Sequence, residues 1–229
     1  MPAKKSVKHR ETAAHPKRFS LVPASAQQQM YRLLDAMKPA LFARASGSEI
    51  AEIAACLALG EQDAVISAGS ALGAQRVRKL LAPAGRGKRC DLREATAQAV
   101  RVLLERDGAS ALVCGGRIAE HDEYRDTFRF AGKFCLPILY LVANSLDVPK
   151  KQQHDLRTLY AEFGIPVFSV DANDAIAVYR VMTEALHNAR HGRGACVIEA
   201  LNLPDSPLSR EAALQLLEGY MRRHGSWPV

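Results

Sequence analysis

The sequence lacks any run of about 18 apolar residues, which is the length that a membrane-spanning helix requires. Its longest apolar run, Leu136–Ala143, is only long enough for a strand. No apolar segment follows the basic residues at the beginning of the sequence, so this region does not match a secretory signal. With 48% hydrophobic and 24% charged residues, the composition is that of a globular protein and excludes a disordered or collagen-like chain.

Cysteine is scarce and scattered along the chain. The five residues are Cys56, Cys90, Cys114, Cys135 and Cys196. Their number is odd and no two are close in sequence, which argues against a disulfide framework and against a zinc site. Four of them lie in apolar stretches, a pattern typical of buried free thiols in a reducing compartment. We therefore expect a cytoplasmic protein.

Basic residues are concentrated near the N-terminus. Residues 1–18 hold six Lys or Arg and one Glu, which accounts for +5 of the net charge of +7. The rest of the chain is nearly neutral, so we expect residues 1–25 to form a basic, disordered tail. A basic tail can bind nucleic acid, but no other feature supports that function. The sequence predicts neither a nucleic-acid partner nor a membrane partner.

Short apolar strands alternate with longer amphipathic helices through the second half of the chain. The expected strands cover residues 110–114, 136–142, 167–170 and 195–200, with a short strand or turn at 63–67. The expected helices cover residues 26–45, 48–59, 70–81, 91–106, 119–133, 152–163, 174–190 and 209–223, and Asp91 is a candidate N-cap. This alternation predicts an α/β fold in one domain over residues 26–229. It consists of a doubly wound parallel sheet with helices on both faces and a helical N-terminal part.

Ligands of such sheets bind at the carboxyl ends of the strands. Two loops follow the ends of expected strands, at residues 115–120 and 143–151. We therefore expect the functional residues of this chain in those two loops.

Several segments of the sequence resemble one family. They are ALVCGGRIAEHDEYRDTFRFAGKFCLPILYLVANS at 111–145, FGIPVFSVDANDAIAVYRVMTEALHNARHGRGACVIEAL at 163–201, LEGYMRRHGSW at 217–227 and, as a weaker match, residues 46–67. They are similar to the alpha subunit of thiamine-diphosphate-dependent 2-oxo acid dehydrogenases of the pyruvate, branched-chain or acetoin type. The resemblance implies a thiamine-diphosphate-binding-like fold and an oxidoreductase that transfers an acyl group to a lipoyl carrier. It also implies a beta-subunit-like partner and association into a hetero- or homo-oligomer.

In that family a strand ends in Gly-Asp-Gly and a later strand ends in Glu-Asn-Asn, and the Asp and the last Asn hold Mg²⁺ on the diphosphate of the cofactor. The first motif here reads Gly-Gly-Arg and the second reads Ala-Asn-Ser. The resemblance thus implies thiamine diphosphate and magnesium as cofactors, with binding positions at Gly115, Gly116, Arg117, Asn144 and Ser145. Because Gly116 and Ser145 replace the two side-chain ligands, we assign no metal ligand and no catalytic residue.

Other residues have two interpretations each. Arg117 either binds a phosphate in place of the lost metal or lies in solvent. His187 and His191, four residues apart, fit either a zinc ligand pair or partners for the negative end of a helix. The acidic run Glu120–Glu123 is more typical of a helix N-terminus than of a metal site, and Cys114 is more typical of core packing than of a reactive thiol.

Two functions of different class follow from these observations. The first is an alpha-subunit-like component of a 2-oxo acid dehydrogenase with weak or lost catalysis in this chain. The family's His-bearing loop before the last helix is shortened here to residues 202–207, which contain no His. The second is a non-catalytic scaffold or regulatory relative that keeps the fold and the assembly surface.

Overall fold

The computed structural model of the protein describes residues 20–37, 49–68, 90–115, 121–145, 156–203 and 209–227. The helices are α1 (Ala24–Asp35), α3 (Glu49–Leu57), α5 (Leu92–Glu105), α6 (His121–Lys133), α7 (Leu156–Ala161), α8 (Ala175–Asn188) and α9 (Arg210–His224). The strands are β1 (Ala64–Ser67), β2 (Ala111–Gly115), β3 (Ile138–Ser145), β4 (Val167–Asp171) and β5 (Cys196–Asn202). A turn of π-helix, Ala189–Arg193, follows α8 directly. The helix expected at 70–81 lies outside the described residues.

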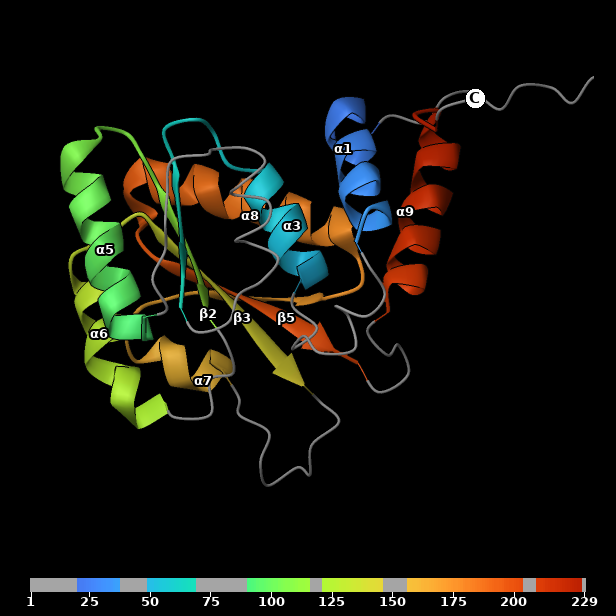
Figure 1. Ribbon diagram of the computed structural model, residues 1–229. Helices are drawn as coiled ribbons and strands as arrows, with labels where there is room; N and C mark the ends of the chain where they lie inside the picture. The colour runs from blue at the N-terminus through green and yellow to red at the C-terminus, as the bar shows by residue number, and fades with distance from the viewer. Residues whose placement is uncertain are drawn as a thin grey trace, which may run out of the picture.

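The described strands form one sheet in the order β1-β2-β3-β5-β4, and every neighbouring pair is parallel. The segment that the sequence left open as a strand or a turn is strand β1, which pairs with β2 from Ala64 to Ser67. Helices cover both faces of the sheet (Figure 1). The predicted parallel, doubly wound α/β architecture is therefore confirmed.

Two hydrophobic cores lie on opposite faces of this sheet. Because side chains alternate along a strand, Leu139 and Leu141 of β3 point into one core, while Ile138, Tyr140 and Val142 point into the other. The first core is covered by α1, α3, α8 and α9, and the second by α5, α6 and α7 (Figure 1). Both faces of the central strands β2, β3 and β5 are thus buried over most of their length, which explains the continuous apolar runs in the sequence.

Side-chain caps begin three of the helices. The predicted cap Asp91 accepts a hydrogen bond from the backbone N–H of Glu94 at 2.7 Å. Asp174 and Ser209 cap α8 and α9 in the same way, at 2.9 and 3.0 Å. A side-chain acceptor satisfies a backbone N–H that has no partner within its own helix, so each cap sets the start of its helix.

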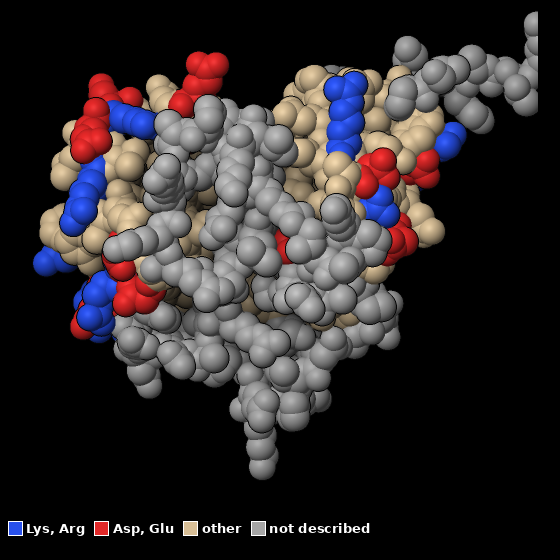
Figure 2. Space-filling model, in the orientation of Figure 1, with Lys and Arg blue, Asp and Glu red and all other residues tan. Residues whose placement is uncertain are grey.

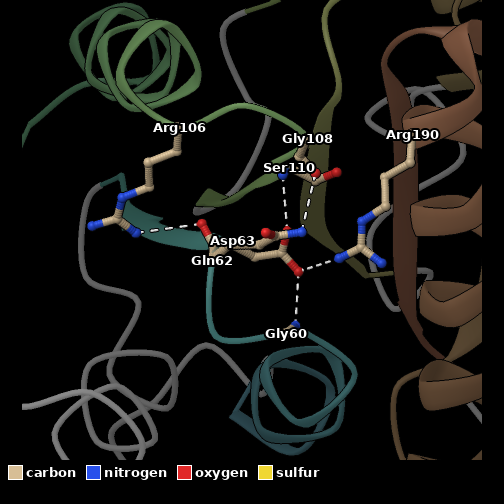
Figure 3. A network of polar contacts seen from close by, with 7 residues as sticks. All are labelled: Gly60, Gln62, Asp63, Arg106, Gly108, Ser110 and Arg190. Atoms are coloured by element: carbon tan, nitrogen blue, oxygen red, sulfur yellow. Dashed lines mark hydrogen bonds and ion pairs between the residues drawn. The ribbon is translucent and has the colours of Figure 1, made fainter.

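Asp63 joins three segments at the amino ends of β1 and β2 (Figure 3). Its carboxylate accepts hydrogen bonds from the backbone N–H groups of Gly60 at 2.7 Å and Ser110 at 2.8 Å, and it forms an ion pair with Arg190. The side chain of Asp63 is fully buried. These contacts hold the beginnings of the two strands against the π-helical turn that follows α8.

The packed structure includes residues that the sequence assigned to the tail. Val22 is only 1% exposed, and the hydroxyl of Ser20 lies 2.9 Å from that of Tyr220 on α9. These contacts dock the segment before α1 against the last helix. Residues 1–19, which hold the basic cluster, lie outside the described residues.

Charged side chains of both signs lie next to one another over α5 and α6 (Figure 2). This mixture agrees with the small net charge that the sequence gives for the chain beyond its first 18 residues. Within the described ranges, no helix is both long enough and apolar enough to cross a bilayer.

Candidate functional site

The carboxyl ends of the strands meet at one edge of the sheet, where the arrowheads of β3 and β5 lie side by side (Figure 1). The chain after β3 leads to α7 on the face of the second core, whereas the chain after β5 leads to α9 on the face of the first. Ligands of open α/β sheets bind where neighbouring strands send their connections to opposite faces. The junction of β3 and β5 is therefore the candidate site.

Gly115 is the last residue of β2 and pairs with Val142 of β3. A Cβ atom at this position would lie 3.6 Å from Cδ1 of Leu92 and 4.0 Å from the carbonyl oxygen of Leu141, which are ordinary contacts. The packing around Gly115 therefore tolerates a side chain. The next two predicted site residues, Gly116 and Arg117, lie outside the described residues.

Asn144 and Ser145 belong to strand β3, and the prediction that a loop begins at residue 143 is wrong. They pair with Leu201 and Asn202 of β5. Because β5 continues to Asn202, it supplies backbone partners that extend β3 beyond its apolar part. The structure thus brings Asn144 to the edge of β3 that faces β5.

The amide of Asn144 is bonded to a buried carboxylate on the neighbouring strand. Its Nδ2 donates to Oε1 of Glu199 at 2.6 Å, and the hydroxyl of Ser169 on β4 donates to Oε2 of Glu199 at 2.5 Å. Glu199 is only 6% exposed. A polar cluster of Asn144, Glu199 and Ser169 therefore links the end of β3 to the middle of β5 and β4 on the face of the second core.

Two further side chains surround this cluster. Arg157 of α7 approaches the hydroxyl of Ser169 with a guanidinium nitrogen at 3.5 Å. Burial raises the pKa of the Tyr160 hydroxyl, and nearby Tyr140 and Glu199 add to the shift. The phenol of Tyr160 thus stays protonated.

Sequence reasoning did not select Glu199 or Ser169 as site residues. One signal for Glu199 was available, because it is the single acid within the apolar run of β5. An acid inside a strand that is buried on both faces needs hydrogen-bond partners. Ser169 offers no comparable signal, since its role depends on strand order.

The described residues at this edge do not fit a magnesium diphosphate. Gly115 has no side chain, the amide nitrogen of Asn144 is directed toward β5, and both oxygens of Glu199 already accept hydrogen bonds. Among the residues that the structure describes, no group of three His, Cys, Asp or Glu can hold a metal ion. Mg²⁺ needs several oxygen ligands that face one point, and this donor set does not provide them.

Cys114 is a core residue, in agreement with the preferred interpretation from sequence. It is fully buried at the end of β2, and a hydrogen bond with Cys56, together with burial, raises the pKa of its thiol. Such a thiol is inert. His187 and His191 lie at the opposite end of the sheet, where the strands begin. Arg190, which pairs with Asp63, lies between them in the sequence.

Comparison with known proteins identifies the family. The model of the family described as "Dehydrogenase E1 component" matches residues 13–203. The alpha subunit of the pyruvate dehydrogenase E1 component of Acholeplasma laidlawii is 31% identical over 104 residues, which are 43% of this chain and 30% of that subunit. The alpha subunit of 3-methyl-2-oxobutanoate dehydrogenase of Mycobacterium tuberculosis is 29% identical over 104 residues, 43% of this chain and 28% of that subunit.

Among solved structures, the 2-oxoglutarate:ferredoxin oxidoreductase from Magnetococcus marinus aligns with a TM-score of 0.49 at 15% identity, over 68% of this chain and 28% of its own. The chain matches under a third of the length of the curated relatives above. The family model, in contrast, covers most of the present chain, from residue 13 to residue 203. The chain therefore belongs to the dehydrogenase E1 component family.

Proposed function

We propose that the chain is an alpha-subunit-like component of a 2-oxo acid dehydrogenase and that it pairs with a beta-subunit-like protein. Membership of the E1 family and the names of the relatives, which are alpha subunits, support this role. The five cysteines are free thiols, four of them buried, which supports a reducing compartment, and we place the protein in the cytoplasm.

Within this role, we propose that the chain does not bind magnesium and thiamine diphosphate and that its own catalysis is weak or lost. The observation that carries this proposal is the bond from Asn144 to Glu199, which directs the amide at the end of β3 toward β5. The residues at the family's ligand positions, Gly116 and Ser145, offer neither a carboxylate nor an amide. A diphosphate bound there would keep most of its charge uncompensated, which is unfavourable.

Calorimetric titration of the full chain with thiamine diphosphate and Mg²⁺ tests this proposal. We expect no saturable binding to the natural sequence. The double variant Gly116→Asp with Ser145→Asn restores both ligand types and should gain metal-dependent binding, whereas Gly116→Ala with Ser145→Ala should not. Micromolar, magnesium-dependent binding by the natural sequence would overturn the proposal.

A non-catalytic scaffold or regulatory subunit is the second candidate function, and it is favoured by the same misfit between the described residues at this end of the sheet and a magnesium diphosphate. Co-expression with a beta-subunit-like protein separates the two candidates. A complex that releases CO₂ from a 2-oxo acid supports the enzyme component. A stable complex without that activity supports the scaffold, and failure to form any complex contradicts both.

A further inference from the structure

The end of α8 carries two histidines that the proposed function does not use. His187 lies in the last turn of α8 and His191 in the π-helical turn that follows. Both side chains are exposed, and residues four apart on a helix lie on the same face. Arg190, between them, instead pairs with the buried carboxylate of Asp63. This ion pair holds the backbone of the turn in place, so the two imidazole rings extend into solvent from an ordered segment.

The two imidazole rings are adjacent and partly aligned. Their centroids are 4.1 Å apart and their planes differ by 36°. The Nδ1 atom of His191 lies 2.6 Å from the carbonyl oxygen of His187. A carbonyl oxygen can only accept, so Nδ1 of the neutral ring carries the proton, and Nε2 has a free lone pair. This arrangement, with one ring nitrogen donating to a backbone carbonyl, is typical of metal-ligating histidine.

The charges around the two imidazole rings mostly favour the binding of a cation. The backbone carbonyls at the end of a helix concentrate negative partial charge, and the exposed Glu184 lies one turn before His187. The positive charge of the exposed Arg193, in contrast, repels a cation. His187 also lines a surface hollow of about 640 Å³ together with Glu184 and Arg180, but His191 does not line it.

From this geometry we propose that His187 and His191 form a bidentate surface site for a divalent transition-metal ion of the zinc, nickel or copper class. Imidazole nitrogen suits these ions, whereas Mg²⁺ and Ca²⁺ require oxygen ligands. Because no described group of three His, Cys, Asp or Glu can hold a metal, water completes the coordination. The site is independent of the cofactor proposal, since it lies at the opposite edge of the sheet.

Titration calorimetry of the full chain with NiCl₂ and with ZnCl₂ tests the site. A Cys135→Ser background removes the one exposed thiol, which would otherwise bind these ions. We expect binding of one ion, weakened at least about tenfold by His187→Gln or His191→Gln. His224→Gln is the matched control, because His224 also lies at a helix end beside another ring, that of Tyr220. This control should leave the affinity unchanged.

Far-UV circular dichroism of each variant checks that the fold is intact, since both histidines are exposed. A metal-dependent rise in the unfolding temperature gives a second readout, and it should disappear in the same two variants. The proposal is overturned by no saturable binding to the background protein. It is also overturned if either histidine variant binds the ion as tightly as the background protein does, or if the His224→Gln control loses as much affinity as the two histidine variants.

Discussion

Asp63 and Arg190 are 127 residues apart in sequence, and their ion pair joins the beginning of β1 to the turn that ends α8. The Asp63 side chain is fully buried, while that of Arg190 remains 34% exposed. The pair therefore ties a strand at one edge of the sheet to a helix of the opposite half of the chain. Two backbone N–H groups complete the coordination of the carboxylate.

Replacing Asp63 with Ala should lower the free energy of unfolding by about 2–4 kcal/mol, because the N–H groups of Gly60 and Ser110 and the guanidinium of Arg190 lose their buried acceptor. Urea denaturation measures the change. Asp126→Ala is the control, since Asp126 is 85% exposed in its pair with Arg129 and should cost less than about 0.5 kcal/mol. Equal effects in the two variants would contradict the assigned role.

Glu199→Ala should destabilise the protein by about 1–3 kcal/mol, because Asn144 and Ser169 would each lose an acceptor. Glu199→Gln keeps one acceptor oxygen and should cost less. Chemical denaturation of both variants measures which of them loses more stability. Glu162→Gln, at an exposed ion pair, is the control. A Glu199→Ala protein as stable as the natural one would show that the cluster contributes nothing to stability.

Two helical glycines should respond in opposite directions to Ala. A Cβ at Gly132 in α6 would lie 2.1 Å from the backbone oxygen of Phe163, so we expect a loss of about 2–3 kcal/mol or more. A Cβ at Gly219 in α9 would lie 3.3 Å from the flexible end of Arg223, and the better helix propensity of Ala should add about 0.5–1 kcal/mol. Thermal unfolding of the two variants tests this contrast, and equal shifts would refute it.

A single thiol should react quickly with an aromatic disulfide reagent at pH 8. Cys135 is the exposed one of the five free cysteines, whereas burial raises the pKa of Cys196 to about 12 and keeps it protonated. At pH 8, a thiol with such a raised pKa has almost none of the reactive thiolate form. Cys135→Ser should abolish the fast phase and Cys196→Ser should leave it, while unfolding in urea should expose the remaining thiols. A fast phase that survives Cys135→Ser would contradict this assignment.

Arg117 lies outside the described residues, and its proposed phosphate contact stays a prediction. If it binds phosphate in place of the metal, Arg117→Ala should weaken pyrophosphate binding in the absence of Mg²⁺. Arg101→Ala, at an exposed position on α5, is the charge-matched control. Unchanged pyrophosphate affinity in Arg117→Ala would mean that the side chain simply lies in solvent.

Features set by local chemistry were predictable from the sequence. Asp91 caps α5 because its carboxylate reaches a backbone N–H three residues on, and that spacing is visible in the sequence. The strands of the second half were recognisable because burial on both faces requires continuous apolar residues. Helix α8 and its end near Gly192, where φ is positive, follow from the same kind of local signal.

Features set by contacts between distant segments were not predictable. The end of β3 was placed three residues too early, at residue 142 rather than at Ser145, because its last pairs depend on how far β5 extends. The polar cluster joins Asn144 to Glu199, 55 residues away, and Ser169 to Glu199, 30 residues away. Only the strand order β3-β5-β4 brings these side chains together. The partners of Glu199 therefore required the structure.

The contact between α1 and α9 (Figure 1) has a consequence for the order of events on the ribosome. Met30 and Leu34 of α1 are fully buried, and α9 supplies Leu217 and Met221 to the same core. Helix α1 leaves the exit tunnel before α9 is synthesised. Part of the apolar face of α1 therefore stays uncovered until α9 has emerged, so the nascent protein exposes apolar surface during that interval.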